Sequence, residues 1–375
     1  MSSVFQKKTC SSAKINLHLA VGEKRADGFH DIESIFVPVS LRDHIDCLVS
    51  RSTAFSVTIR GMEGSGQVGI SGDIPLEQNL MYRAALLFHH TTRLAFSLRI
   101  VIEKNIPQGA GLGGGSSNAA AVLGVLNEAA GFPLSHDAFM EAAARLGSDV
   151  PFFVKGKAAF ITGRGEKVAP FDLARDLFFV LVTPAFASGT AEAYRLLDER
   201  RSVSRELVPQ ESVSPETLIA ALEKPPSAWP YRNDFQSVFL DDLYTHSGAC
   251  STSSYKISMC RERGVHDTFG GGKRPVGGGA EGVDRSEGSA KRAATSPIQP
   301  SISLGETYRE LFSSLQETGA GFTLLSGSGS TVFGVYESVD AAEAAVEGLS
   351  GRHWRSQQLE TRPPLVRSCA AIRCS

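Results

Sequence analysis

The chain has 375 residues, more than the ~100–200 of a typical single domain, which predicts two domains. Its net charge of −2 argues against a general nucleic-acid or membrane-surface binder, and no apolar run reaches the ~18 residues of a membrane span. The N-terminus lacks the apolar core of a signal peptide, and the six cysteines form no C-x-x-C pair. We therefore expect reduced thiols and a cytoplasmic location.

Apolar residues alternate with polar ones in several short segments, which predicts strands, and recur at helical spacing in others. We expect strands within residues 13–22, 44–52, 55–61, 95–107, 158–170 and 176–184, and on both sides of a glycine turn at 326–331. We expect helices within 79–93, 117–130, 135–147, 190–200 and 338–349, and another at the start of 306–336. Residues 23–36 contain a D-G turn signal and predict a loop that runs into a strand. The lack of a regular βαβ rhythm favours an α+β fold over a doubly wound parallel sheet.

Residues 246–303 differ from the rest of the chain, because they are rich in glycine, serine and charge and hold few apolar side chains. Such a segment cannot bury a core of its own, so we expect a disordered insertion. We predict an N-terminal nucleotide-binding domain over 1–165, a C-terminal substrate domain over 166–350 that the insertion interrupts, and a C-terminal tail over 351–375.

The most informative segment is PQGAGLGGGSS at residues 107–117, a glycine-rich loop that joins a predicted strand to a predicted helix. Because glycine costs conformational entropy, such a cluster is either a flexible connector or a place where the backbone approaches a ligand. Ser116 and Ser117 stand where a helix N-cap is expected, and the unpaired N–H groups of a helix N-terminus attract phosphate. We favour phosphate binding over a linker or a cap alone.

GAGLGG also fits the G-x-G-x-x-G fingerprint of dinucleotide-binding proteins, which leaves a dehydrogenase open as an alternative. That fold needs an acidic residue at the end of the next strand, about 20 residues on, whereas Glu128 lies inside the predicted helix. The V-A-I-K and H-R-D motifs of protein kinases do not occur in the sequence.

Three motifs in order resemble those of the GHMP kinases, the family of galactokinase, homoserine kinase and mevalonate kinase. They are SSAKINLHL near the N-terminus, PQGAGLGGGSSNAAA in the centre and LLSGSGSTVFG near the C-terminus, and the match covers residues 11–245 and 304–340. The resemblance implies an N-terminal nucleotide-binding domain with a left-handed β-α-β phosphate loop and a C-terminal ferredoxin-like domain. It also implies an ATP-dependent kinase, with Mg²⁺ expected.

Four further segments narrow the resemblance within the family: AKINL, RADGFHDIES, GSDVPFF and TAEAYRLLD. They are similar to the members that phosphorylate the 2-hydroxyl of 4-diphosphocytidyl-2-C-methyl-D-erythritol, a step of non-mevalonate isoprenoid synthesis. The expected partner is therefore a small molecule, a cytidine diphosphate-linked methylerythritol, and neither nucleic acid nor membrane. We expect a monomer or a homodimer. A kinase for mevalonate, homoserine or a sugar is the alternative, and RADGFH argues against it.

The resemblance also implies roles for individual residues. It makes Asp149 the general base for the substrate hydroxyl and Lys14 a nearby cation that lowers the pKa of that carboxyl or of the hydroxyl. On their own, Asp149 would be a turn or N-cap residue and Lys14 a strand-edge lysine that reaches solvent. The ATP-binding residues would be Pro107, Gln108, Gly109, Ala110, Gly111, Leu112, Gly113, Gly114, Gly115, Ser116 and Ser117. A catalytically silent nucleotide-binding relative stays open, although such a protein has no need to keep both Lys14 and Asp149.

The same resemblance implies a substrate site for a cytosine base and its attached alcohol. Asn16 would hold the substrate hydroxyls, and His30 would hydrogen-bond the base, with Phe29 stacked on it in a position where the family usually has tyrosine. Tyr194 would supply a second ring, although a tyrosine on an amphipathic helix is more often part of the core. Thr190 would either donate to a substrate phosphate or cap its helix.

The third glycine motif, with Gly327, Ser328 and Gly329, is expected to approach the glycine-rich loop, the alternative being a plain β-turn. No acidic pair indicates a metal site, so we assign no metal ligand and name only Ser117 as a candidate.

Overall fold

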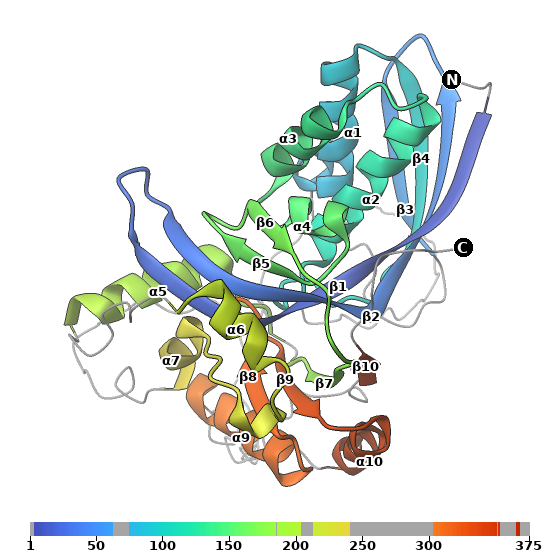
Figure 1. The fold of residues 1–375 in the computed structure, drawn as a ribbon. Helices are drawn as coiled ribbons and strands as arrows, with labels where there is room; N and C mark the ends of the chain where they lie inside the picture. The colour runs from blue at the N-terminus through green and yellow to red at the C-terminus, as the bar shows by residue number, and fades with distance from the viewer. Residues whose placement is uncertain are drawn as a thin grey trace, which may run out of the picture.

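Two β-sheets organise the chain (Figure 1). The computed structural model describes residues 4–62, 75–184, 186–203, 213–240, 303–350 and 352, together with the backbone of 365–367. Strands of the first sheet are β1 (Val4–Lys24), β2 (His30–Arg51), β3 (Ser56–Gly61), β4 (Phe96–Glu103), β5 (Ala159–Thr162) and β6 (Lys167–Pro170). Their order is β3-β4-β2-β5-β6, with β1 paired to β2, and only the β3–β4 pair of this sheet is parallel.

β1 and β2 form one long antiparallel hairpin, whose pairing runs from Val4 opposite Ser50 to Lys24 opposite His30. The sequence predicted a separate strand at 44–52, and the structure instead has one continuous strand from residue 30. The middle of β1 is buried on both faces. Ile15 and Leu17 belong to the same apolar cluster as Phe179 and Phe333 of the second sheet, which joins the two sheets through this strand.

Four helices cover the first sheet on one face (Figure 1): α1 (Leu80–Thr92), α2 (Gly114–Ala129), α3 (His136–Leu146) and α4 (Val150–Lys155). A short 3-10 turn, Leu76–Gln78, precedes α1. α2 contacts β1, β2 and α1, and its apolar side chains, among them Val122 and Leu126, are fully buried in the main core. This central helix is the one that follows the glycine-rich segment, so its N-terminus is fixed by the core of the first domain.

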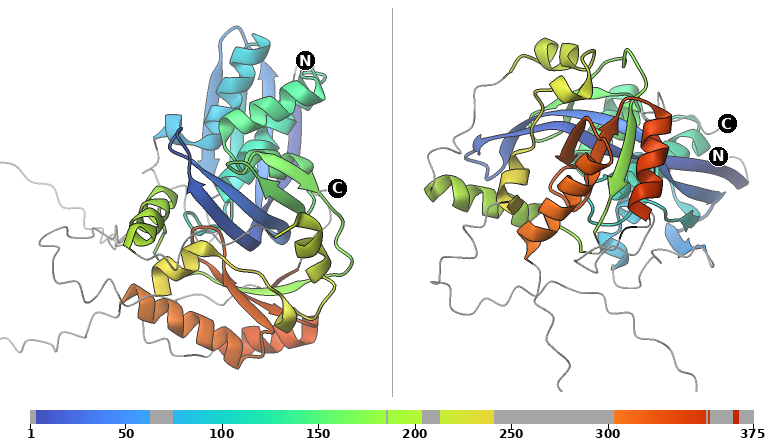
Figure 2. Two further views of the ribbon diagram at one scale, coloured as in Figure 1. Left: turned by 60° about the vertical axis from the view of Figure 1, so that its left-hand side comes forward. Right: turned by 90° about the horizontal axis from the view of Figure 1, so that it is seen from below.

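The second sheet consists of β7 (Phe178–Val182), β8 (Phe322–Leu325), β9 (Val332–Tyr336) and β10 (Leu365–Arg367), in the antiparallel order β10-β7-β9-β8. When these four strands are numbered 1 to 4 along the chain, their order across the sheet is 4-1-3-2. This is the strand order of a ferredoxin-like βαββαβ unit. α9 (Leu304–Glu317) and α10 (Val339–Ser350) lie on its outer face (Figure 2). Among the described residues between β7 and α9 the elements are α5 (Thr190–Val203), α6 (Pro215–Ala221), the 3-10 turn Pro226–Ala228 and α7 (Asp234–Leu240).

The expected two-domain α+β organisation is confirmed. The boundary drawn after residue 165 stays a prediction, and the first sheet extends beyond it to β6. Of the expected insertion at 246–303, residues 246–302 lie outside the described residues, while Ser303 caps α9 in a reciprocal capping box with Glu306. Within the expected tail at 351–375 the structure has a strand, β10, that pairs with β7.

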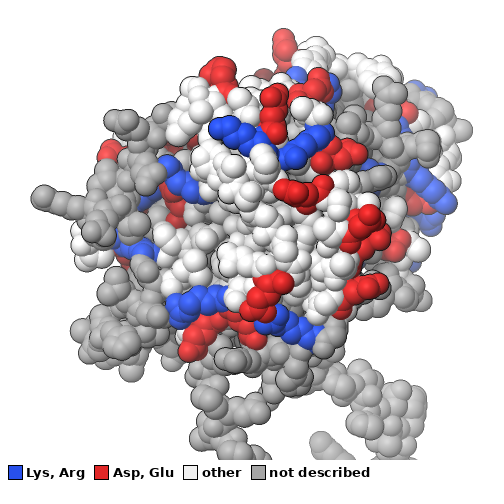
Figure 3. Space-filling model, turned by 60° about the horizontal axis from the view of Figure 1, so that its bottom comes forward, with Lys and Arg blue, Asp and Glu red and all other residues white. Residues whose placement is uncertain are grey.

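The cysteines depart in part from the expectation of reduced thiols. Cys47 is free and buried, whereas Cys10 is disulfide-bonded. No helix among the described residues is long and apolar enough to cross a membrane. On the face drawn in Figure 3, lysine and arginine side chains are mixed with acidic ones.

Candidate active site

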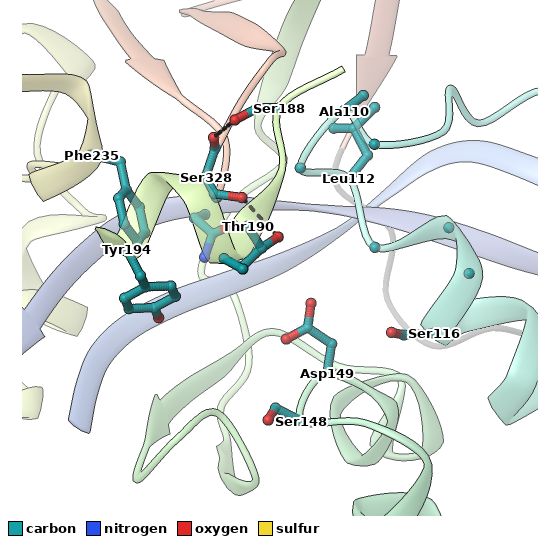
Figure 4. Close-up of a pocket in the computed structure, with 18 of the residues that line it drawn as sticks. Ala110, Leu112, Ser116, Ser148, Asp149, Ser188, Thr190, Tyr194, Phe235 and Ser328 are labelled. Atoms are coloured by element: carbon teal, nitrogen blue, oxygen red, sulfur yellow. Dashed lines mark hydrogen bonds between the residues drawn. The ribbon is translucent and has the colours of Figure 1, made fainter. Parts of the chain in front are cut away.

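A cavity of about 1150 Å³ lies where β1, the glycine-rich segment, α5 and the third glycine motif meet. Of the predicted site residues, every one except Ser117 and Gly329 lines it. Figure 4 draws this cavity, with Asp149 on one side and Thr190, Tyr194 and Ser328 facing it from another. The cavity is therefore the place where the predicted motifs come together.

The glycine-rich segment ends in a helix N-terminus that no side chain caps. Helix α2 begins at Gly114, and its N-cap is Gly113 in the left-handed conformation with φ +71°. The sequence predicted the cap at Ser116 and Ser117, which is wrong, because both serines lie inside the first turn of the helix. Without a capping oxygen, the first N–H groups of α2 remain available to an anion at the positive end of the helix dipole.

The three motifs are held together by main-chain and serine contacts. The Lys14 amide of the first motif donates to the Leu112 carbonyl at 3.0 Å, which ties β1 to the glycine-rich segment. Ser326 Oγ of the third motif donates to the Gly111 carbonyl at 3.1 Å. Gly111 has φ +75°, and a Cβ there would lie 2.1 Å from the Ser326 carbonyl oxygen. Only glycine permits this approach of two backbones.

Lys14 and Asp149 face one another across the cavity wall. Lys14 Nζ lies 3.9 Å from Asp149 Oδ2, and the lysine side chain is 4% exposed while the aspartate side chain is 31% exposed. The ammonium group also donates to Asn16 Oδ1 at 2.6 Å and lies 4.7 Å from the centre of the Phe36 ring. Burial lowers the pKa of Lys14 from its usual value, and the charge of Asp149 opposes this shift.

Asp149 occupies the N-cap position of α4, yet its side chain makes no capping hydrogen bond. The sequence in isolation favoured Asp149 as a turn or N-cap residue. In the structure its carboxylate does not cap the helix. The carboxylate lies instead on the cavity wall, as Figure 4 shows.

Asn16 connects the lysine to the next strand. Its Oδ1 accepts from Lys14, and its Nδ2 donates to Ser34 Oγ on β2 at 3.1 Å. Ser34 in turn donates to the His18 carbonyl oxygen. All of these polar groups are buried, so the chain of hydrogen bonds fixes both Lys14 and Asn16 in place.

Phe29 and His30, two of the aromatic residues predicted to bind a base, lie at the turn of the β1–β2 hairpin, and the third, Tyr194, lies on α5. Phe29 is 51% exposed, whereas His30 is 6% exposed and stacks on Tyr194 at a ring distance of 5.1 Å. Phe235 packs its edge against Tyr194 at 4.8 Å. Burial, and next the charge of Asp149, raise the pKa of Tyr194 to about 12. His30 thus covers one face of Tyr194, the ring that the sequence analysis offered to the base.

Two contacts orient His30. Its Nδ1 lies 3.0 Å from the Gly22 carbonyl oxygen, and its Nε2 lies 3.2 Å from Asp198 Oδ1, off the direction that a hydrogen bond needs. Asp198 also accepts from Lys24 Nζ at 2.8 Å. The imidazole therefore stands between a carbonyl and a carboxylate.

The third glycine motif meets the start of α5. Thr190 Oγ1 lies 3.1 Å from Ser328 Oγ, and Ser188 Oγ donates to the Ser328 carbonyl at 2.7 Å (Figure 4). Gly327 lies against Lys14 and Asn16, because a Cβ there would be 3.3 Å from Lys14 Nζ. Gly329 has φ +89° and packs against Tyr308. The motif is thus more than a turn between two strands.

Several residues of the site escaped the sequence analysis. Asp198 lies on the same face of α5 as Thr190 and Tyr194, and their spacing of four residues would have indicated it. Asn233 is buried and donates to the carbonyls of Leu325 and Gly327 at 2.7 and 2.8 Å. No local sequence pattern points to that long-range contact.

The described residues contain no group of three or more histidine, cysteine, aspartate or glutamate side chains that could hold a metal ion. Ser117 is 1% exposed, and its Oγ has no hydrogen-bond partner. The neighbouring Ser116, not Ser117, lines the cavity within the described residues.

Comparison with known proteins agrees with this geometry. The family model described as "GHMP kinases N terminal domain" matches residues 79–157, and "GHMP kinases C terminal" matches 287–356. A protein of Alkaliphilus metalliredigens named 4-diphosphocytidyl-2-C-methyl-D-erythritol kinase is 30% identical, with 91% of each chain covered. One of the same name from Parabacteroides distasonis is 38% identical over 61% of this chain and 77% of its own length.

Solved structures support the fold. A crystal structure of 4-(cytidine 5'-diphospho)-2C-methyl-D-erythritol kinase superposes with a TM-score of 0.63 at 24% identity, covering 97% of this chain and all of the other. A crystal structure described as "L. major mevalonate kinase in complex with R-mevalonate" superposes with a TM-score of 0.59 at 13% identity, covering 99% of this chain and 98% of the other. The motifs, the family models and the extent of the sequence match lead to one conclusion: the chain belongs to the GHMP kinase family.

Proposed function

We propose that this chain transfers the γ-phosphoryl group of ATP to the 2-hydroxyl of 4-diphosphocytidyl-2-C-methyl-D-erythritol, a step in the synthesis of isoprenoid precursors. The observation that carries the proposal is the Lys14–Asp149 pair beside the uncapped N-terminus of α2, in one cavity. The name shared by the relatives at 30% and 38% identity supports the substrate.

The glycine-rich segment is suited to bind the triphosphate. Phosphoryl transfer depends mainly on positioning and on neutralising the charge of the transferred group. The free N–H groups at the start of α2 and the helix dipole supply partial positive charge, and the buried Lys14 supplies a full one. This backbone conformation supports the proposed role of residues 107–117 in binding ATP.

Asp149 is suited to accept the proton of the substrate hydroxyl. The hydroxyl oxygen attacks the γ-phosphorus in line, the bond between that phosphorus and the β,γ-bridging oxygen breaks, and ADP leaves. The hydroxyl proton passes to Asp149, whose carboxylate is accessible from the cavity and is not used as a helix cap. Lys14, held by Asn16 and Phe36, keeps a positive charge next to that carboxylate.

The substrate would lie with its base near Phe29 and His30 and its alcohol near Asn16 and Asp149. Phe29 offers an exposed ring for stacking, and His30 also lines the cavity beside it. Because His30 already covers one face of Tyr194, we propose that Tyr194 supports His30 from behind. Thr190, beside Ser328, is placed to donate to a substrate phosphate.

Mg²⁺ is the expected companion of ATP. In phosphoryl-transfer sites this ion keeps several waters and binds phosphate oxygens with one or two carboxylates. The unpartnered hydroxyl of Ser117, in the first turn of α2, is an oxygen donor of the right kind, and the described residues hold no all-protein cage. This donor set fits an ion that arrives on the triphosphate and neutralises its charge.

Two alternatives differ in what they bind. Another member of the family, acting on mevalonate, homoserine or a sugar, would use the same glycine-rich segment and Asp149 but not Phe29 and His30. A dinucleotide-binding oxidoreductase would bind NAD and tolerate loss of Asp149. A cytoplasmic location and a monomeric or homodimeric state remain part of the proposal.

The test is ADP release from ATP and Mg²⁺ with the cytidine diphosphate-linked methylerythritol, beside mevalonate, homoserine and galactose. Turnover with the first substrate alone supports the proposal. Turnover with one of the other alcohols would keep the kinase chemistry and reject the proposed substrate. ATP binding without turnover of any of the four would favour a silent nucleotide-binding protein.

A further inference from the structure

The turn between β5 and β6 brings an arginine, Arg164, to the wall of the same cavity. The backbone on both sides of it is fixed. Gly163 and Gly165 have φ +69° and +118°, and the Gly163 carbonyl accepts from the Ile32 amide of β2 at 2.8 Å. The Arg164 amide donates to Glu166 Oε2 at 2.7 Å. The turn therefore projects the Arg164 side chain from a defined position.

The guanidinium group of Arg164 lies over the exposed ring of Phe29, with its central carbon 4.6 Å from the ring centre. A guanidinium group over an aromatic face is a favourable arrangement. Its N–H groups point outward in the plane of the guanidinium and stay free to bind an anion. Arg164 thus lies next to the ring on which the base is proposed to stack.

The other positive side chains of the cavity already have acidic partners. Five lysines and arginines line it: Lys14, Lys24, Lys104, Arg164 and Arg195. Their ion-pair partners are Asp149 for Lys14, Asp198 for Lys24, Asp43 for Lys104, and Glu192 and Glu199 for Arg195. Arg164 alone among these five has no carboxylate within ion-pair distance in the part of the chain that the structure describes. Its charge is therefore available to an anionic ligand.

The location of the turn indicates which anion. Arg164 contacts Phe29 at one end of the substrate site, and its neighbour Gly165 lies beside the reacting end, since a Cβ on Gly165 would be 3.8 Å from Asp149 Oδ1. In the proposed substrate, the diphosphate stands between the cytidine and the alcohol that reacts. A cation placed between Phe29 and Asp149 therefore faces the diphosphate.

We propose that Arg164 binds the diphosphate of the substrate and thereby selects a nucleoside diphosphate-linked alcohol over an alcohol without it. This inference rests on the proposed function and adds a specificity-determining residue to it. The guanidinium fork can make two parallel hydrogen bonds to phosphate oxygens, which a lysine at the same place cannot reproduce. Loss of a charged hydrogen-bonded pair of this kind corresponds to roughly a 10- to 100-fold loss of affinity.

The test compares the wild type with Arg164→Gln, Arg164→Lys and Arg60→Gln. Arg60 is an exposed arginine on β3 outside the described lining of the cavity, so its variant controls for the loss of one surface charge. Calorimetry gives the affinity for cytidine 5'-diphosphate and for cytidine, and steady-state kinetics gives KM for the alcohol and for ATP. Thermal unfolding checks that each variant is folded.

We expect the wild type to bind cytidine 5'-diphosphate more tightly than cytidine, and Arg164→Gln to lose most of that difference. KM for the diphosphate substrate should rise roughly 10- to 100-fold while KM for ATP stays within about twofold, with partial recovery in Arg164→Lys. Equal affinities of wild type and Arg164→Gln for cytidine 5'-diphosphate would overturn the inference. Because binding is measured without turnover, an inactive wild type that still shows the Arg164-dependent preference would reject the proposed reaction and retain the diphosphate site.

Discussion

The carboxylate of Asp149 lies 3.9 Å from the ammonium group of Lys14, and the lysine is the deeper of the two, at 4% against 31% exposure. Under the proposed function this difference suits the two groups to different roles, because the more accessible carboxylate can meet a substrate hydroxyl while the buried ammonium group sets the local charge. The two side chains come from different motifs of the chain, and the fold brings them together.

The first prediction concerns Asp149→Asn, which keeps the size of the side chain and removes its basicity. We expect kcat to fall by roughly 10²- to 10⁴-fold, the usual contribution of a general base, with KM for ATP nearly unchanged. Steady-state kinetics of ADP release measures both. Asp172→Asn is the control, because that carboxylate is 85% exposed and pairs with Lys157 at the surface, outside the described lining of the cavity. A variant at residue 149 with wild-type kcat would remove Asp149 from the mechanism.

The second prediction concerns the stability cost of Lys14. Burial lowers its pKa from 10.5, so between the lowered pKa and 10.5 the unfolded chain binds a proton that the folded chain does not. The free energy of unfolding therefore rises with pH across that window. Lys14→Met should abolish turnover yet unfold at a higher urea concentration than the wild type at pH 7, since it removes the desolvated charge.

The comparison at high pH provides the control for Lys14. The advantage of Lys14→Met should shrink as the pH rises toward 10, because between its lowered pKa and 10.5 the unfolded wild type binds a proton that the folded wild type does not. Urea unfolding curves of both proteins at the two pH values measure this difference. A variant that is less stable than the wild type at pH 7 would mean that the bonds to Asn16 and the contact with Phe36 outweigh desolvation.

The parts of the fold that the sequence predicted well are those with strong local signals. Alternation of apolar residues indicated the strands of both sheets other than β10, and the residue types of the three motifs indicated which segments meet in the cavity. The start of α2 was misplaced by three residues, because serine is the better cap in isolation. In the chain, Gly113 takes a left-handed conformation under Lys14 and Phe153, where no Cβ fits.

The parts that the sequence did not predict depend on contacts between distant segments. Strand β10 is three residues long and exists as a strand through its pairing with β7. Asn233 donates hydrogen bonds to two carbonyl groups at the third glycine motif, about ninety residues further along the chain. Nothing in the sequence around Asn233 indicates these hydrogen bonds. The stacking of His30 on Tyr194 joins the β1–β2 hairpin to α5, so the composition of neither segment could show which face of the tyrosine is covered.

The third prediction tests the close approach of the central and third motifs. Gly111→Ala places a Cβ 2.1 Å from the Ser326 carbonyl at a φ of +75°, which is both a clash and a strained conformation. We expect weaker ATP binding and a lower melting temperature. Gly124→Ala is the matched control within α2, because its Cβ meets nothing within 4 Å and alanine favours the helix by about 1 kcal/mol. Equal melting temperatures for Gly111→Ala and the wild type would show that the backbones can separate without cost.

The fourth prediction concerns acid stability and His18, a buried histidine beside the site. Its Nδ1 accepts from the Arg232 amide at 3.3 Å, so the ring is bound in its neutral form. Burial, and next the charge of Arg232, lower the pKa of His18 from 6.5 to about 4, while Asp234 opposes this shift. Between these values the unfolded chain binds one more proton than the folded chain, so the free energy of unfolding falls as the pH falls from 6.5 to 4.

At 1.36 kcal/mol per pKa unit, the shift of His18 corresponds to a loss of roughly 3 kcal/mol across this window. His18→Gln keeps a neutral polar side chain and should remove that part of the slope, whatever its stability at pH 7. The exposed His44 on β2 gives the control variant His44→Gln, which should keep the wild-type slope. Urea unfolding at pH 7, 6, 5 and 4 measures all three proteins. If the stability of His18→Gln falls with acid as steeply as that of the wild type, other groups than His18 set the acid sensitivity of the fold.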